Sequence, residues 1–120
     1  MLPQLHTQAY QQLLDALLTL QQLATETEPD VQALQERFEL VQHVFQGQIM
    51  GLSVEELQPS ILVKWQSVRT EIHRALRLLG TEMLFLRSAK DVATYQRRLV
   101  TLRDRLAQLI GYAQVMIESE

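Results

Sequence analysis

The residues that could do chemistry are few: three histidines, no cysteine and scattered serines in 120 residues. A nucleophilic triad would have to use serine, and no serine lies in a glycine-flanked strand-to-helix turn that would expose it. Metal sites in helical bundles use inward-pointing Glu-x-x-His pairs, and neither His43 nor His73 has a glutamate three residues earlier. A glycine-rich phosphate loop is also missing. We therefore expect no catalytic residue, no metal and no cofactor, and a protein that is not an enzyme.

One histidine has a more specific alternative role. The segment HVFQG, residues 43–47, resembles the His-x-Leu-Lys-Gly core of histidine-containing phosphotransfer domains, which are helical bundles of about this size. At about 100° per residue, His43 lies about 160° around a helix from Phe45, so its imidazole should be exposed, as a phosphoacceptor requires. Gln46 stands where that family has a lysine, and it brings no charge to hold a phosphoryl group. Phosphotransfer through His43 is the alternative function.

Charge is divided unequally between the two halves of the chain. Residues 1–58 hold one basic and eight acidic residues, a balance of −7, whereas residues 59–120 hold ten basic and six acidic residues, a balance of +4. Either the acidic and basic helices of one bundle lie against each other, or the basic half receives an acidic partner. The total of −3 and the scarcity of aromatic residues argue against nucleic-acid binding.

The elements that must position these residues are helices. Leucine, glutamine, alanine, glutamate and arginine dominate, and apolar residues recur at alternating steps of three and four, the period of one helix face. Helices are predicted over about residues 3–25, 29–47, 59–90 and 91 to near the C-terminus. The core stripes of the four helices are Tyr10, Leu13, Leu17, Leu20 and Ala24; Val31, Leu34, Phe38, Val41 and Phe45; Ile61, Trp65, Val68, Ile72, Leu76, Leu79, Met83 and Leu86; and Val92, Tyr95, Leu99, Leu102, Leu106, Leu109, Ala113 and Met116.

Four such helices bury their stripes most simply as one all-α domain, residues 1–120: an antiparallel four-helix bundle whose first and second helices are shorter than the third and fourth. No apolar run approaches the roughly 18 residues that span a membrane. The N-terminus has no basic-then-apolar export signal and the chain has no cysteine, so we expect a soluble, cytoplasmic protein.

The segment RLLGTEMLFLRSAK, residues 77–90, has apolar residues on more than one side of its helix. Leu78 and Phe85 lie about 120° to 140° from the core stripe and seven residues apart, hence on one outer face. Gly80 between them costs about 1 kcal/mol relative to alanine in a helix interior. Either the helix bends at Gly80 and turns Phe85 inward, or another molecule covers this face.

The second of these alternatives predicts an interface on the two long helices. Tyr112 and Val115 leave the stripe of the fourth helix, while Arg74 and Arg77 lie on the outer face of the third. Either a partner protein or a second copy, forming a homodimer, would cover this surface, whereas a purely structural subunit would form a tight oligomer with no outside partner. The predicted interface comprises Arg74, Arg77, Leu78, Phe85, Tyr112 and Val115.

The run WQSVRTEIHRALRLLGTEMLFLRSAK, residues 65–90, together with the opening MLPQLHTQAYQQLL, resembles the small cyanobacterial PatD family of heterocyst frequency control proteins. The likeness is strongest in TEIHRALRLL and MLFLRSA and includes no catalytic motif. The resemblance implies a regulator that acts through protein contact. It also implies the tubulin-like division protein FtsZ as the partner, and an influence on cell division and heterocyst differentiation as the outcome.

Overall fold

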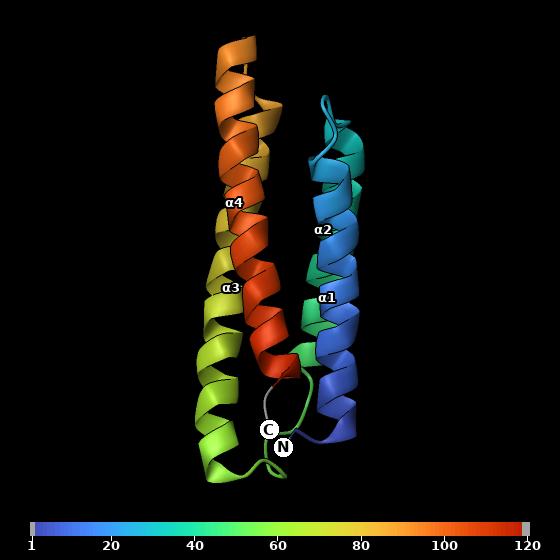
Figure 1. Cartoon of the computed structure of the whole chain (residues 1–120), viewed down its shortest axis with the longest axis vertical. Helices are drawn as coiled ribbons and strands as arrows, with labels where there is room; N and C mark the ends of the chain where they lie inside the picture. The colour runs from blue at the N-terminus through green and yellow to red at the C-terminus, as the bar shows by residue number, and fades with distance from the viewer. Residues whose placement is uncertain (1, 119–120) are drawn as a thin grey trace.

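The computed structural model describes residues 2–118, which form four helices joined by short connections (Figure 1). The helices are α1 (Gln4–Ala24), α2 (Val31–Val44), α3 (Pro59–Arg87) and α4 (Val92–Ile117), and a π-helical turn, η1 (Phe45–Ile49), continues α2. This part of the chain contains no strand. The all-α prediction is confirmed.

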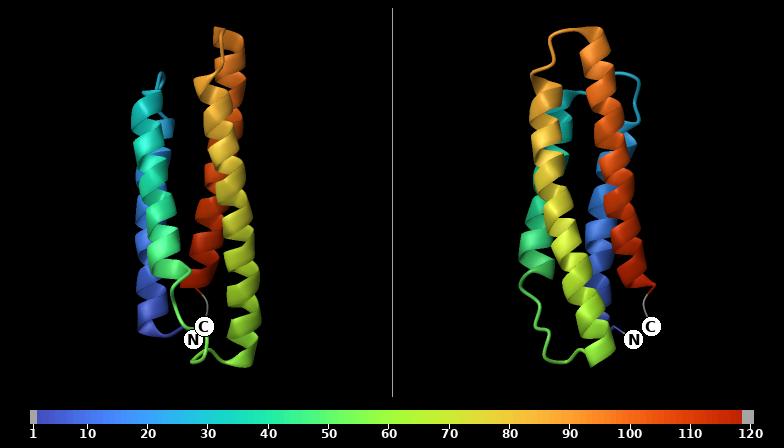
Figure 2. Two further views of the ribbon diagram at one scale, coloured as in Figure 1. Left: turned by 180° about the vertical axis from the view of Figure 1, so that it is seen from behind. Right: turned by 90° about the vertical axis from the view of Figure 1, so that its left-hand side faces the viewer.

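The four helices pack together as two hairpins, α1 with α2 and α3 with α4. The main contact between the hairpins joins α1 to α4, the first and last helices, and a smaller contact joins α2 to α3. The molecule measures 50 × 20 × 19 Å, and Figures 1 and 2 show the helices running up and down its long axis in turn. The connection between α3 and α4 extends beyond the connection between α1 and α2 (Figure 1).

The core follows the predicted stripes with few exceptions. Every stripe residue is buried except Val31, Val68 and Tyr95, which are partly buried, and Val92, which is 76% exposed. The placement of Val92 in the core was wrong, because α4 begins where the α3–α4 hairpin extends beyond the α1–α2 hairpin (Figure 1). Val92 instead lines a hollow of about 480 Å³ between the α1–α2 connection and the first turns of α4.

Three helices begin at residues that are favourable at a helix N-terminus. Pro59 occupies the first turn of α3, where its missing N–H is no loss. Asp30 caps α2 by accepting a hydrogen bond from the backbone N–H of Gln32 at 3.0 Å. Asp91 caps α4 by accepting from the N–H of Thr94 at 2.8 Å and from its hydroxyl at 3.1 Å, and these bonds lower the pKa of the Asp91 carboxyl.

Candidate functional site

Leu78 and Phe85 lie on the outer side of α3, where they are 41% and 46% exposed. The helix is continuous from Pro59 to Arg87, so it passes through Gly80 without ending. A bend that turns Phe85 into the core is therefore not what the structure contains. Both side chains are left for another group to cover.

Gly80 lies between Leu78 and Phe85 in the sequence, and close packing against another helix accounts for the absence of a side chain there. A Cβ added to Gly80 would lie 3.4 Å from Cζ and 3.5 Å from Cε2 of Phe38 on α2. Phe38 is buried, so its ring occupies the space beside α3 that a larger side chain would need. The close approach at Gly80 is thus made by an aromatic side chain, and it brings α2 and α3 together.

Phe85 is partly covered from within the chain. The guanidinium carbon of Arg98, on α4, lies 4.7 Å from the centre of the Phe85 ring. A cation over an exposed aromatic face contributes about 0.5–1 kcal/mol. Phe85 therefore presents a half-exposed aromatic ring beside a positive charge.

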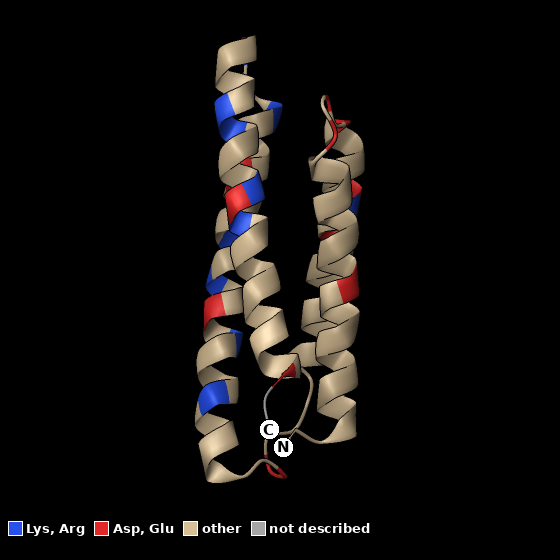
Figure 3. Ribbon diagram, viewed as in Figure 1, with Lys and Arg blue, Asp and Glu red and all other residues tan. Residues whose placement is uncertain are grey.

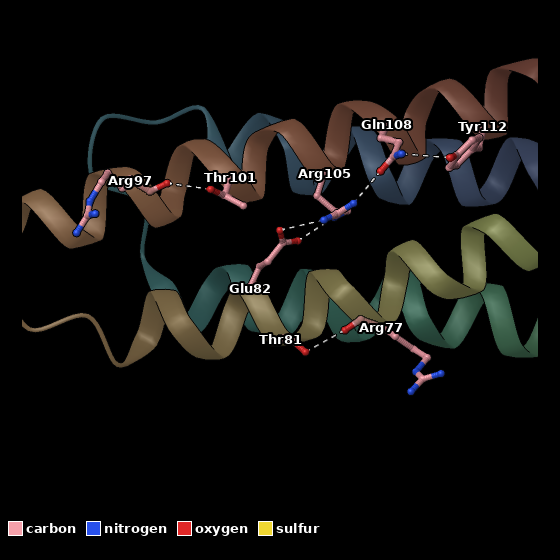
Figure 4. A network of polar contacts seen from close by, with 8 residues as sticks. All are labelled: Arg77, Thr81, Glu82, Arg97, Thr101, Arg105, Gln108 and Tyr112. Carbon is pink, nitrogen blue, oxygen red and sulfur yellow. Dashed lines mark hydrogen bonds and ion pairs between the residues drawn. The ribbon is translucent and has the colours of Figure 1, made fainter.

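Arg74, Arg77, Leu78 and Thr81 line a shallow hollow of about 300 Å³ on α3. Arg74 lies 3.8 Å from Glu71 in the only ion pair that either arginine makes within residues 2–118. The Arg77 side chain extends away from the bundle and forms no ion pair in that range (Figure 4). An exposed leucine beside an unneutralised guanidinium suits a contact surface for a partner that is both apolar and acidic.

A second hollow, of about 240 Å³, lies between α3 and α4 and shares Arg74 and Leu78 with the first. Arg105, Gln108 and Tyr112 line the α4 side of this hollow, and polar contacts link them (Figure 4). Arg105 donates from Nε to Glu82 at 3.1 Å and from Nη1 to Gln108 at 3.0 Å, and the amide of Gln108 donates to the Tyr112 hydroxyl at 3.1 Å.

This chain of contacts fixes Tyr112, which is partly buried rather than free on the surface. Val115, one turn further along α4, is 44% exposed. The structure thus brings Arg74, Leu78 and Tyr112 to one groove, with Arg77 at its outer rim. The bond between Glu82 and Arg105 was not predicted from the sequence, because helix periodicity does not show which residues of two neighbouring helices meet.

The opposite charges of the two halves are not joined by ion pairs within the described part of the chain. Both ion pairs there belong to the α3–α4 hairpin. Arg103 does reach the other hairpin, but it donates to backbone carbonyls, those of Ala24 at 2.6 Å and Glu26 at 3.0 Å. Ala24 is the last residue of α1 and Glu26 lies just beyond it, at a helix end where backbone carbonyls have no hydrogen-bond partner within the helix. The α1–α2 hairpin therefore carries mainly acidic charges, whereas the α3–α4 hairpin carries most of the basic residues together with several acidic ones (Figure 3).

The three histidines lie in different surroundings. His43 is exposed in the last turn of α2, as its predicted face requires. His73 is exposed on α3 and stacks on Phe45 with ring centres 6.1 Å apart. His6 is buried, and its Nε2 lies 2.7 Å from the carbonyl oxygen of Ser53. His6 thereby attaches the α2–α3 connection to α1, a role that its position in the sequence does not reveal.

His6 belongs to a buried aromatic cluster with Tyr10 and Trp65. The Trp65 ring meets those of His6 and Tyr10 edge-on, with centres 4.8 and 5.0 Å away. His6 Nδ1, the Tyr10 hydroxyl and Trp65 Nε1 are buried without a hydrogen-bond partner among the described residues. Burial raises the pKa of Tyr10.

Residues 2–118 contain no cluster of three or more histidine, aspartate or glutamate side chains that could hold a metal ion. None of the helices in this range is long and apolar enough to cross a membrane. None of the protein-family models, curated proteins and solved structures compared with the chain matches it. The geometry of the helices is therefore what bears on function.

Proposed function

We propose that this chain is a non-enzymatic protein-interaction module that binds a partner through the surface of Arg74, Arg77, Leu78, Phe85, Tyr112 and Val115. The observation that carries the proposal is the exposure of Leu78 and Phe85 on a helix whose opposite face is buried. Covering a leucine and a phenylalanine contributes about 1.5–3 kcal/mol each, which is enough to make them central to a contact.

The resemblance to the PatD family supports a particular partner and setting. We propose that the module is cytoplasmic, binds FtsZ and so modulates cell division and heterocyst differentiation. The proposed scaffold is an antiparallel four-helix bundle in one domain, with α1 and α2 shorter than α3 and α4. Its two longer helices carry the interface.

The test is binding of purified FtsZ by the wild type and by a variant that carries Leu78→Asp and Phe85→Asp. If burial of the two side chains contributes about 3 kcal/mol in total, Kd should rise about 100-fold in this variant. Helix content measured by circular dichroism should stay unchanged, because neither side chain is in the core.

Leu18→Asp on α1 is the matched control, because Leu18 and Leu78 are both 41% exposed. It should bind FtsZ as the wild type does. Unchanged binding by the Leu78 and Phe85 variant would exclude this surface, and loss of its helix content would show that the two residues support the fold instead.

His43 supports the alternative of histidine phosphotransfer, since its imidazole is exposed on a helical bundle. Incubation with a phosphorylated receiver domain should then give an acid-labile label that His43→Gln abolishes. His73→Gln is the control, because His73 is also exposed on a helix. No label on the wild type, or equal labelling of His43→Gln, would eliminate this function.

A further inference from the structure

Two helices carry the same local arrangement with opposite charge. On α2 the segment ERFEL places Glu36 and Glu39 three residues apart, followed directly by Leu40. All three side chains are exposed, and Leu40 is 43% exposed although it is a large apolar residue. We call these three residues the acidic strip. Two residues lie between the glutamates: Arg37, which is exposed, and Phe38, which is buried.

On α3 the segment RALRL repeats this spacing. Arg74 and Arg77 are three residues apart and Leu78 follows directly, 41% exposed. The residue between the arginines that matches Phe38 is Leu76, which is also buried. We call Arg74, Arg77 and Leu78 the basic strip. Each strip is thus an exposed leucine beside two like charges on the outer side of a core helix, with one difference: the exposed Arg37 also neighbours Leu40 on α2, whereas the matching residue on α3 is the buried Ala75.

The two strips do not pair within one chain. Both leucines are open to solvent, and neither ion pair of residues 2–118 involves Glu36 or Glu39. The side chain of Glu39 accepts only a long hydrogen bond, 3.5 Å, from the neutral amide of Gln35. The carboxylates of α2 and the guanidinium of Arg77 therefore form no ion pair with any of residues 2–118.

We infer that the acidic strip of one copy docks on the basic strip of a second copy. The contact would cover two leucines that are exposed in the monomer and would bring each pair of like charges against a pair of the opposite sign at the same spacing. A second copy is the occupant that the structure itself supplies, because both complementary surfaces belong to this one chain. The inference goes beyond the partner contact and does not depend on the identity of that partner.

The symmetry of such a contact determines whether the assembly stops at a dimer or grows further. The acidic strip belongs to the α1–α2 hairpin and the basic strip to the α3–α4 hairpin, so two different surfaces meet. After one docking the first copy still has a free basic strip and the second a free acidic strip, so a contact of this type continues to further copies, as an open chain or, where the rotation closes, as a ring. The assembly should therefore grow with protein concentration and not stop at a dimer.

The contact should also be weak and sensitive to salt, because its charged pairs are exposed. Raising the salt concentration from about 0.1 M to about 1 M shortens the screening length from about 10 Å to about 3 Å. We expect this change to weaken association by about tenfold. Sedimentation velocity over a protein concentration series at both salt concentrations measures the effect.

Two charge-reversed variants test the geometry. Arg74→Glu with Arg77→Glu makes both strips acidic, and Glu36→Arg with Glu39→Arg makes both strips basic. Each variant alone should stay monomeric, whereas a one-to-one mixture should regain the concentration-dependent growth of the wild type, because every contact in the mixture joins opposite charges again. Recovery in the mixture also shows that both variants are folded.

Three results would overturn the inference: a wild type that stays monomeric up to about 1 mM, a wild type that stops at a dimer, or a mixture that does not associate. The Glu36 and Glu39 variant also separates this inference from the proposed function. It should lose self-association and still bind FtsZ, since its α3–α4 surface is unchanged. Binding of FtsZ without any self-association of the wild type would leave the proposed function standing and remove the inference.

Discussion

Replacing Gly80 by valine should destabilise the protein, whereas the same change at Gly111 should stabilise it. Both glycines lie inside long helices, so both cost about 1 kcal/mol relative to alanine. Their surroundings differ, because a Cβ at Gly111 meets no atom within 4 Å and a Cβ at Gly80 lies 3.4 Å from the Phe38 ring. The two positions form a matched pair for testing how α2 packs against α3.

The expected magnitudes follow from these contacts. At Gly111, alanine should stabilise by about 1 kcal/mol and valine by about 0.4 kcal/mol, as their helix propensities differ. At Gly80, a methyl group at 3.4 Å makes an ordinary contact, so alanine should stabilise by about 0.5–1 kcal/mol. Compared with alanine, valine at position 80 adds two carbon atoms beside the Phe38 ring, and its side chain cannot rotate freely in a helix. Overpacking of this kind costs about 1–3 kcal/mol.

Thermal unfolding followed by circular dichroism measures these differences. For 120 residues the unfolding entropy of about 2.1 cal/mol/K per residue makes 1 kcal/mol equal to about 4 °C in Tm. Gly80→Val should therefore melt about 2–10 °C below the wild type, and Gly111→Val about 2 °C above it. Combining Gly80→Val with Phe38→Leu should reduce the penalty by about 1 kcal/mol, because the two positions share one space. If Gly80→Val melts at as high a temperature as Gly111→Val, the Phe38 ring does not pack against position 80.

Three further predictions concern buried or bridging polar groups. Tyr10→Phe should stabilise by about 1 kcal/mol because it removes a buried hydroxyl that has no partner among the described residues, whereas Tyr95→Phe should destabilise by about 1 kcal/mol because it removes a 3.2 Å hydrogen bond to the carbonyl of Pro29. Because burial raises the pKa of Tyr10, ionisation of this group leaves the free energy of unfolding unchanged below about pH 10 and lowers it as the pH rises further. Urea unfolding at rising pH should therefore show a smaller loss of stability in Tyr10→Phe. Arg103→Met should lower the free energy of unfolding by about 2 kcal/mol because two carbonyls at the end of α1 lose a charged donor, and urea unfolding of Arg103→Lys should give an intermediate value.

Periodicity alone was sufficient to predict the four helices and nearly all of the core. Steps of three and four place Leu13 and Leu17, or Leu102 and Leu106, on one buried face whatever their neighbours are. The exposure of Leu78 and Phe85 followed from the same counting, since both lie off the stripe of α3. A helix wheel fixes the direction of each side chain around its own axis, and these predictions need nothing more.

Contacts between helices required the structure, because they depend on how far one helix is shifted along another. The Phe38 ring beside Gly80 joins residues that are distant in sequence, and so does the bond from Arg105 to Glu82. Val92 shows the complementary error: its spacing fits the stripe of α4, but the neighbouring hairpin ends before it can cover that position. Local sequence does not encode where another helix ends.

The packing of the first helix against the last has a consequence for how the chain is made. Arg103 and Tyr95 bond to carbonyls 66 to 79 residues earlier, and α1 meets α4 along a main contact of the molecule. During synthesis α1 and α2 leave the ribosome before α4, so the side of α1 that α4 covers stays open until this 26-residue helix has emerged. The nascent chain therefore carries an uncovered apolar face until α4 emerges, and chaperones that bind such faces should recognise it before that point and not afterwards.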